Sequence, residues 1–199
     1  MTAAREHFGP PVSVGAWIPN GLTLARLAAA PALLALAFGP WEADGGALLV
    51  LFALAALTDL ADGALARALR AETEFGARLD PFADKALVLA GLGVAWGQGG
   101  LAGLHLVPVA AIALREALVA FWRVRAPARF AGSSMLSKAK TALQMLAVGL
   151  ILAAPLAPQA PVGAVGLGAL WIAALLALAS LGRYAARAAA PSPEEGGRR

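Results

Sequence analysis

The chain has no cysteine, so disulfide bridges and thiolate metal sites are excluded. Charge is also scarce, because only 14% of the 199 residues are Asp, Glu, Lys or Arg. Apolar residues make up 60%, above the roughly 45 to 50% of soluble domains. With a mean hydropathy of +0.72, these values predict an integral membrane protein. The net charge of +4 does not indicate a protein that binds nucleic acid. His7 and His105 have no cluster of partner residues in the sequence, so we expect them to have no catalytic role.

Hydropathy along the chain predicts an all-α, polytopic membrane protein with a bundle of six transmembrane helices, each of about 20 residues. The predicted spans are residues 22–38, 45–67, 81–98, 101–123, 136–155 and 163–186. A short N-terminal cytoplasmic or interfacial segment, 1–21, precedes the membrane domain, 22–187. The Pro-, Gly- and charge-rich tail, 188–199, is expected to be disordered.

Positive charge is distributed unevenly over the predicted connections. The first, third and fifth connections have no Lys or Arg, whereas the second and fourth contain Arg70, Arg78, Arg125 and Arg129. Further arginines lie in both tails. By the positive-inside rule, both termini and these two loops are expected to be cytoplasmic, in a multi-pass protein of the inner or cell membrane.

Four aspartates stand in the segment from Asp59 to Asp84, which reads DLADGALARALRAETEFGARLDPFAD. Asp59 and Asp62, at i and i+3, share a face near the end of the second predicted helix. The next helix is predicted to begin at Asp80, with Pro81 in its first position and Asp84 at i+4. Carboxylates at membrane depth are costly, so they predict a functional site that opens to the cytoplasm.

Oxygen ligands of this kind favour hard divalent cations, and Mg²⁺ often combines carboxylates with substrate phosphates. Gly63 leaves room for a bulky group, Arg67 supplies a cation, and Gly76 allows a tight turn or a close phosphate. The alternative is a solvated loop in which the aspartates pair with nearby cations. That alternative explains neither the paired helical spacing nor the glycines; its cations would be Arg67, Arg70, Arg78 and Lys85.

The spacing D59-x2-D62-G63-x2-A66-R67-x8-G76-x3-D80-x3-D84 resembles the signature of the CDP-alcohol phosphatidyltransferase family. The resemblance implies a six-helix, usually homodimeric membrane enzyme that uses Mg²⁺ or Mn²⁺ to displace CMP from a CDP-linked lipid with an alcohol. It implies metal ligands at Asp59, Asp62, Asp80 and Asp84, with Asp84 also the catalytic base. The implied CDP-lipid contacts are Asn20, Thr23, Arg26, Asp62, Gly63, Arg67 and Gly76.

The segment IPNGLTLARLAAAP, residues 18–31, is similar to the family's opening and contributes Arg26 as a diphosphate contact. A snorkelling anchor is the alternative for Arg26. Three other segments, DPFADK, LREALVAFWR and SKAKTALQM, resemble a branch that transfers from CDP-diacylglycerol to glycerol 3-phosphate. VAFWR and Ser137 depart from that branch's usual residues, which affects the acceptor assignment and not the reaction class.

Glycerol 3-phosphate is a dianion, so its site needs cations, and Arg115, Lys138 and Lys140 are the candidates. Arg115 lies in an apolar helix and needs a partner, but Glu116 points about 100° away on a helix. A structural Arg–Glu arrangement remains the alternative. Lys138 and Lys140 lie on different faces and near the interface, so a positive-inside membrane anchor is the alternative for at least one of them. Lys140 is favoured because Thr141 and Gln144 continue its polar neighbourhood.

Three other functions remain open from the sequence. The first keeps the reaction and changes the acceptor to inositol phosphate, phosphatidylglycerol or another polar alcohol. The others are a Mg-dependent membrane prenyltransferase and a small cation transporter. One contiguous aspartate motif and about six spans fit the prenyltransferase poorly, and a transporter does not explain Gly63, Arg67 and Gly76.

Overall fold

The computed structural model describes residues 17–40, 43–69, 74–125 and 135–189. Within these ranges side chains are described except at 17–20, 59–69, 74–78, 80–81, 123–124, 135–138, 183 and 187–189. The described residues form six α-helices, two short 3₁₀ helices and no strand. The α-helices are α1 (Trp17–Phe38), α2 (Gly45–Leu69), α3 (Glu74–Gly97), α4 (Leu106–Arg125), α5 (Met135–Ala153) and α6 (Val162–Ala189). The 3₁₀ helices are η2 (Gly103–His105) and η3 (Ala154–Leu156).

Among the described residues, four helical segments are long and apolar enough to cross a membrane: Gly21–Phe38, Gly103–Trp122, Ala139–Leu156 and Val162–Ala186. The apolar part of α2, Gly45–Thr58, is shorter because the aspartate segment follows it. The predicted all-α, polytopic membrane fold is therefore confirmed. The orientation of its ends relative to the membrane stays a prediction.

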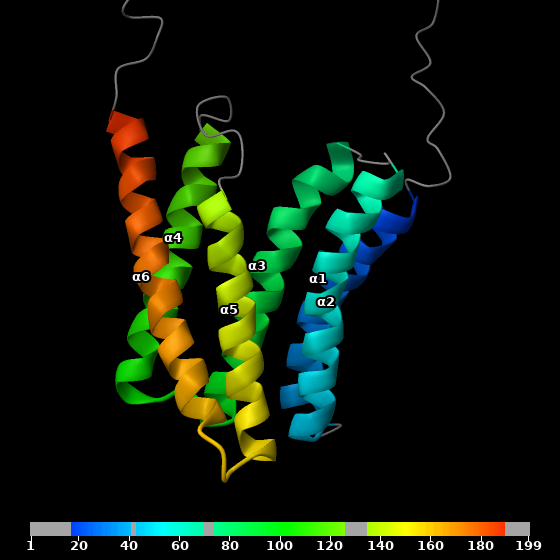
Figure 1. Cartoon of the computed structure of the whole chain (residues 1–199), viewed down its shortest axis with the longest axis vertical. Helices are drawn as coiled ribbons and strands as arrows, with labels where there is room; N and C mark the ends of the chain where they lie inside the picture. Colours follow the sequence, from blue (N-terminus) through cyan, green and yellow to red (C-terminus); the bar gives the residue numbers. More distant parts are fainter. Residues whose placement is uncertain (1–16, 41–42, 70–73, 126–134, 190–199) are drawn as a thin grey trace, which may run out of the picture.

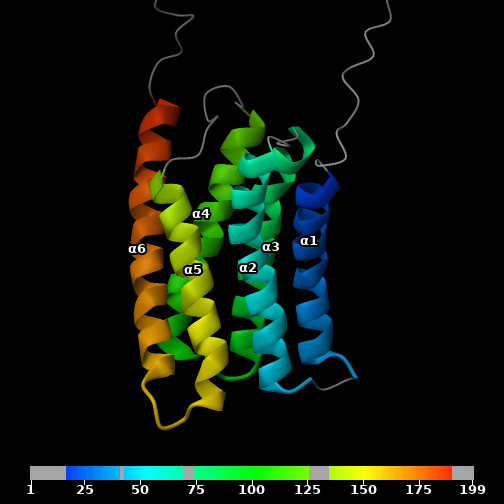
Figure 2. The same ribbon diagram turned by 45° about the vertical axis from the view of Figure 1, so that its right-hand side comes forward.

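The six helices run alternately up and down, side by side (Figures 1 and 2). Helix α1 packs against α2 and α3, whereas α6 packs against α4 and α5. Helix α5 also contacts α2 and α3, so it joins the two halves of the bundle. The end of α2 and the start of α3 consequently lie at the same end of the bundle, where α4 ends and α5 begins (Figure 1).

The core between these helices is built from apolar side chains of several elements. Leu33, Phe52, Leu87, Val148 and Leu170 are all buried, and each comes from a different helix. Helix α3 approaches α2 and α5 closely at Gly91, where a Cβ would lie 2.5 Å from Cγ1 of Val148 and 2.8 Å from Cε2 of Phe52. A glycine at this position therefore sets the distance at which α3 packs.

The start of α3 differs from the prediction. The helix begins at Glu74 and not at Asp80, so Pro81 lies inside it and Gly76 belongs to its first turns, not to a loop. The prediction relied on the preference of proline for the first helical position. A proline inside a helix loses one backbone hydrogen bond, but membrane helices tolerate this, and α1 likewise continues through Pro31.

Candidate active site

Asp84 is the one predicted metal ligand whose side chain is described, and it forms an ion pair with Arg26. Nη1 of Arg26 donates to Oδ1 of Asp84 at 2.9 Å, which joins α1 to α3. Nε of the same guanidinium donates a longer bond of 3.4 Å to Oγ1 of Thr58 on α2. The Arg26 side chain is fully buried, so it is neither a snorkelling anchor nor a surface cation.

The other aspartates are placed by their backbone only. Asp59 and Asp62 lie in the second half of α2, and Asp80 and Asp84 lie in the first half of α3. Because α2 and α3 are antiparallel, all four lie at one end of the bundle, and the helical spacing within each pair is as predicted (Figure 1). The side chains of Asp59, Asp62 and Asp80 lie outside the described residues.

By residue type alone, four aspartates on two neighbouring helices would suit a hard divalent cation, which prefers carboxylate oxygens. Among the described side chains alone there is no group of three possible metal ligands. Of the predicted CDP-lipid contacts, Thr23 is buried on α1, one turn before Arg26. The others, Asn20, Gly63, Arg67 and Gly76, have side-chain positions outside the described part of the chain, as does Lys138.

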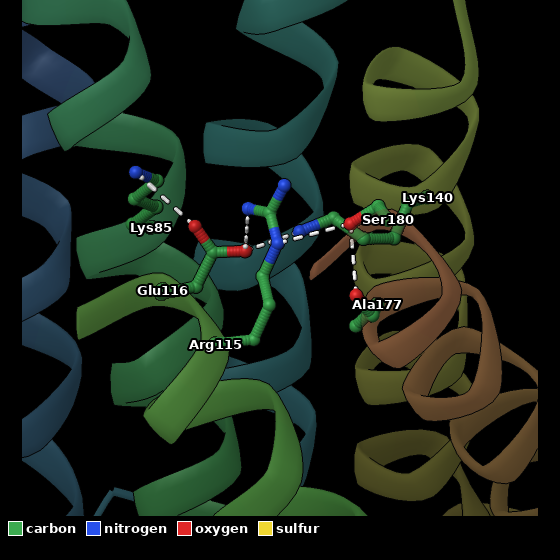
Figure 3. Close-up of polar contacts among 6 residues, drawn as sticks. All are labelled: Lys85, Arg115, Glu116, Lys140, Ala177 and Ser180. Carbon is green, nitrogen blue, oxygen red and sulfur yellow. Dashed lines mark hydrogen bonds and ion pairs between the residues drawn. The ribbon is translucent and has the colours of Figure 1, made fainter. Parts of the chain in front are cut away.

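A second polar cluster surrounds Glu116, which is only 7% exposed (Figure 3). Nη1 of Arg115 donates to Oε1 of Glu116 at 2.8 Å, and Nζ of Lys140 donates to the same oxygen. Nζ of Lys85 lies 3.1 Å from the other oxygen, Oε2. That contact is an ion pair without hydrogen-bond geometry, because Oε2 accepts no hydrogen bond among the described residues. We call Lys85, Arg115, Glu116 and Lys140 the basic cluster.

Helix α6 fixes the orientation of Arg115 within the basic cluster. Nε of Arg115 donates to Oγ of Ser180 at 3.1 Å, and this hydroxyl donates in turn to the carbonyl of Ala177 at 2.8 Å (Figure 3). The guanidinium also lies 5.4 Å from the ring centroid of Tyr184, within cation–π range. Arg115 is thereby held on three sides.

The basic cluster carries an excess of positive charge. Among the described side chains, three cations share one carboxylate, which gives a formal charge of +2; Arg115 and Lys140 are each 2% exposed and the Lys85 side chain is 26% exposed. Buried charges are costly unless they are paired, so a bound anion would stabilise this arrangement. A phosphate dianion would balance it.

Lys85 connects the two polar regions. It follows Asp84 directly on α3, and its side chain reaches Glu116 on α4. The Arg26–Asp84 ion pair and the basic cluster are therefore linked through neighbouring residues of α3.

Sequence reasoning placed Arg115 and Lys140 correctly in a common neighbourhood, although their acceptor role stays a prediction. It argued against the adjacent Glu116 as the partner of Arg115, because neighbouring residues diverge by about 100° around a helix, and kept a structural Arg–Glu arrangement as the alternative. The structure shows an Arg–Glu ion pair, because Arg115 donates to Glu116. The long guanidinium side chain bends back across that angle. From the sequence, Lys85 was considered only as a cation that could pair with the aspartates. The sequence does show four charged residues on otherwise apolar helices, and such residues usually pair with one another, so a common cluster could have been predicted from them.

The fold and the two polar regions define a multi-pass membrane protein with a carboxylate site next to a buried cationic site. The family model described as CDP-alcohol phosphatidyltransferase matches residues 16–185. The chain therefore belongs to the CDP-alcohol phosphatidyltransferase family, and the resemblance drawn from the aspartate signature is confirmed.

Individual relatives agree with this assignment. The CDP-diacylglycerol–glycerol-3-phosphate 3-phosphatidyltransferase of Cereibacter sphaeroides is 45% identical over 139 residues, which cover 67% of this chain and 62% of that protein. The enzyme of the same name from Sodalis glossinidius is 33% identical over 171 residues, 84% of this chain and 92% of that protein. A cardiolipin synthase (CMP-forming) of Oryza sativa subsp. japonica is 35% identical over 186 residues, 84% of this chain and 56% of that protein.

Proposed function

We propose that the protein transfers the phosphatidyl group of CDP-diacylglycerol to glycerol 3-phosphate, giving phosphatidylglycerophosphate and CMP. The observation that carries this proposal is the basic cluster, which has a formal charge of +2 among the described side chains and includes Lys85, the residue after Asp84 on α3. Its charge is opposite and equal to that of a phosphate monoester dianion. The names of the Cereibacter and Sodalis relatives support the same substrates.

In this proposal Asp84 takes the proton from the 1-hydroxyl of glycerol 3-phosphate. The hydroxyl oxygen then attacks the β-phosphorus of the CDP-lipid, the bond from that phosphorus to CMP breaks, and CMP leaves with the electron pair. Arg26 fixes the direction of the Asp84 carboxylate through their ion pair. We therefore propose that Arg26 positions Asp84, in addition to the diphosphate contact expected from the sequence.

The acceptor is held by its phosphate against Arg115 and Lys140, with Lys138 as a further candidate at the start of α5. Positioning of the two substrates then supplies much of the rate enhancement, because it converts an encounter of two molecules into a reaction within one complex. Arg67 is proposed to stabilise the departing CMP. The lipid chains enter from the membrane between helices.

Mg²⁺ or Mn²⁺ is the proposed cofactor, held by Asp59, Asp62, Asp80 and Asp84. When bound, the ion would neutralise the diphosphate and polarise its phosphoryl oxygen. Contacts to the CDP-lipid are proposed for Asn20, Thr23, Asp62, Gly63 and Gly76. We also propose a homodimer in the inner or cell membrane, with both termini and the site on the cytoplasmic side.

Phosphatidylglycerol is the second candidate acceptor, favoured by the cardiolipin synthase among the relatives. Its phosphodiester carries one negative charge, so it would leave the basic cluster with an uncompensated charge. A phosphate monoester balances the charge of the basic cluster in full, which is why glycerol 3-phosphate is preferred here.

A competition assay tests the proposal. Purified protein in detergent with CDP-diacylglycerol and Mg²⁺ is given glycerol 3-phosphate, inositol phosphate and phosphatidylglycerol together, and the lipid products are identified by mass spectrometry. Phosphatidylglycerophosphate is expected as the main product, and chelation of the metal should abolish its formation. A predominance of cardiolipin or of an inositol lipid would contradict the proposed acceptor.

A further inference from the structure

Gln144 is buried, and the mechanism above gives it no role. Its side chain lies on α5 and is 3% exposed, yet Nε2 has no hydrogen-bond acceptor among the described residues. A buried amide donor without an acceptor loses its hydration and gains nothing, at a cost of about 1–3 kcal/mol. Native proteins rarely leave such a group unsatisfied, so the position calls for a ligand.

The position of Gln144 indicates which ligand. It follows Lys140 by four residues, so the two side chains lie on one face of α5, roughly 6 Å apart along the helix axis. Further along the same face come Ala147, Val148 and Ile151, all buried and apolar. Gln144 is therefore the last polar side chain of this face before the apolar core begins.

Arg115 also has a guanidinium nitrogen that can donate a further hydrogen bond. Its Nε donates to Ser180 and its Nη1 donates to Glu116 (Figure 3), whereas no described residue accepts a hydrogen bond from Nη2. The basic cluster thus combines an excess charge of +2 with a free guanidinium nitrogen, and Gln144 adds an amide donor one turn below. A neutral ligand would accept hydrogen bonds from these donors but would not balance the positive charge of the basic cluster. An anion with several oxygen acceptors satisfies both.

We propose that Nε2 of Gln144 donates a hydrogen bond to a phosphate oxygen of the acceptor substrate, a phosphate monoester, beside Arg115 and Lys140. This inference rests on the proposed function and adds a binding residue that the family signature does not contain. Gln144 closes the phosphate site on its core side. It therefore discriminates against acceptors that lack a terminal phosphate.

The test uses Gln144→Met, which keeps the length of the side chain and removes the donor, in the full-length protein. Gln98→Met is the matched control, because Gln98 is exposed just after the end of α3. Thermal midpoints are measured without ligand, with inorganic phosphate, with glycerol 3-phosphate and with glycerol. The KM for glycerol 3-phosphate and for CDP-diacylglycerol is measured from CMP release.

Gln144→Met is expected to leave the ligand-free midpoint unchanged or to raise it, since an unsatisfied donor contributes no stability. The upward shifts caused by phosphate and by glycerol 3-phosphate should shrink. The KM for glycerol 3-phosphate should rise roughly tenfold or more, as expected for a hydrogen bond to a charged group, while the KM for CDP-diacylglycerol stays the same. Gln98→Met should match the unsubstituted protein throughout.

Several outcomes would overturn the inference. A lowered midpoint with intact phosphate shifts would make Gln144 structural, and loss of the glycerol 3-phosphate shift alone would assign its bond to a hydroxyl. No phosphate shift in the unsubstituted protein would also reject the site. If phosphate shifts that protein but not Gln144→Met, while glycerol 3-phosphate releases no CMP, the proposed function fails and the phosphate contact stands.

Discussion

Arg26 on α1 and Asp84 on α3 form an ion pair of unequal burial. The Arg26 side chain is fully buried, whereas the Asp84 side chain is 20% exposed, and Nη1 lies 2.9 Å from Oδ1. The residue that is left after removal of its partner therefore differs in burial between the two cases. Loss of Asp84 removes a partner of a fully buried cation, whereas loss of Arg26 leaves a carboxylate that water can reach.

This asymmetry predicts unequal losses of stability. Asp84→Asn should lower the free energy of unfolding by up to about 3–5 kcal/mol, the cost of breaking an ion pair at its buried cation, and Arg26→Met should lower it by less. The double variant should lose less unfolding free energy than the two single losses added together. Unfolding of all four proteins in one detergent measures the coupling, and strictly additive effects would show that the pair is not energetically linked.

The basic cluster should respond to added anions when its own anion is removed. Glu116→Gln keeps the size of the side chain but leaves three cations without a carboxylate, so the thermal midpoint should fall. Inorganic phosphate should raise the midpoint of Glu116→Gln more than that of the unsubstituted protein, because it binds the folded state and replaces the lost charge. Equal shifts in the two proteins would argue against an anion site.

The close approach of α3 to its neighbours predicts a steric effect at Gly91. Gly91→Ala places a methyl group against Val148 and Phe52, which should destabilise the protein by about 1–3 kcal/mol. Gly168→Ala is the matched control, since a Cβ at Gly168 in α6 meets nothing within 4 Å. Thermal midpoints of the two variants provide the comparison, and a Gly91→Ala midpoint equal to that of Gly168→Ala would mean that the helices can separate at no cost.

The fold was largely predictable because membrane-spanning helices can be recognised in a sequence as long apolar segments. The six predicted spans correspond in order to the six helices, and the main error concerns α3. Pro81 resembles a helix start in the sequence, but whether a helix continues before a proline depends on what packs around it. Local preference could not supply that information.

The candidate site was predictable in its residue types and less so in its contacts. Regular spacing was sufficient to pair Asp59 with Asp62 and Asp80 with Asp84, since helical periodicity fixes which residues share a face. Contacts between helices, such as Arg26 with Asp84 or Lys85 with Glu116, depend on how helices far apart in the sequence pack. Gln144 stood out only once its burial was known.

The central claim is that the basic cluster binds the phosphate of the acceptor while the aspartate site performs the transfer. The most direct test is the ratio of kcat/KM for glycerol 3-phosphate to kcat/KM for glycerol, measured in the unsubstituted protein and in Arg115→Met. Arg115→Met is expected to reduce this ratio by about tenfold or more, because only the phosphorylated acceptor loses a charge-assisted hydrogen bond. An unchanged ratio, with both acceptors retained or both lost in parallel, would contradict the account.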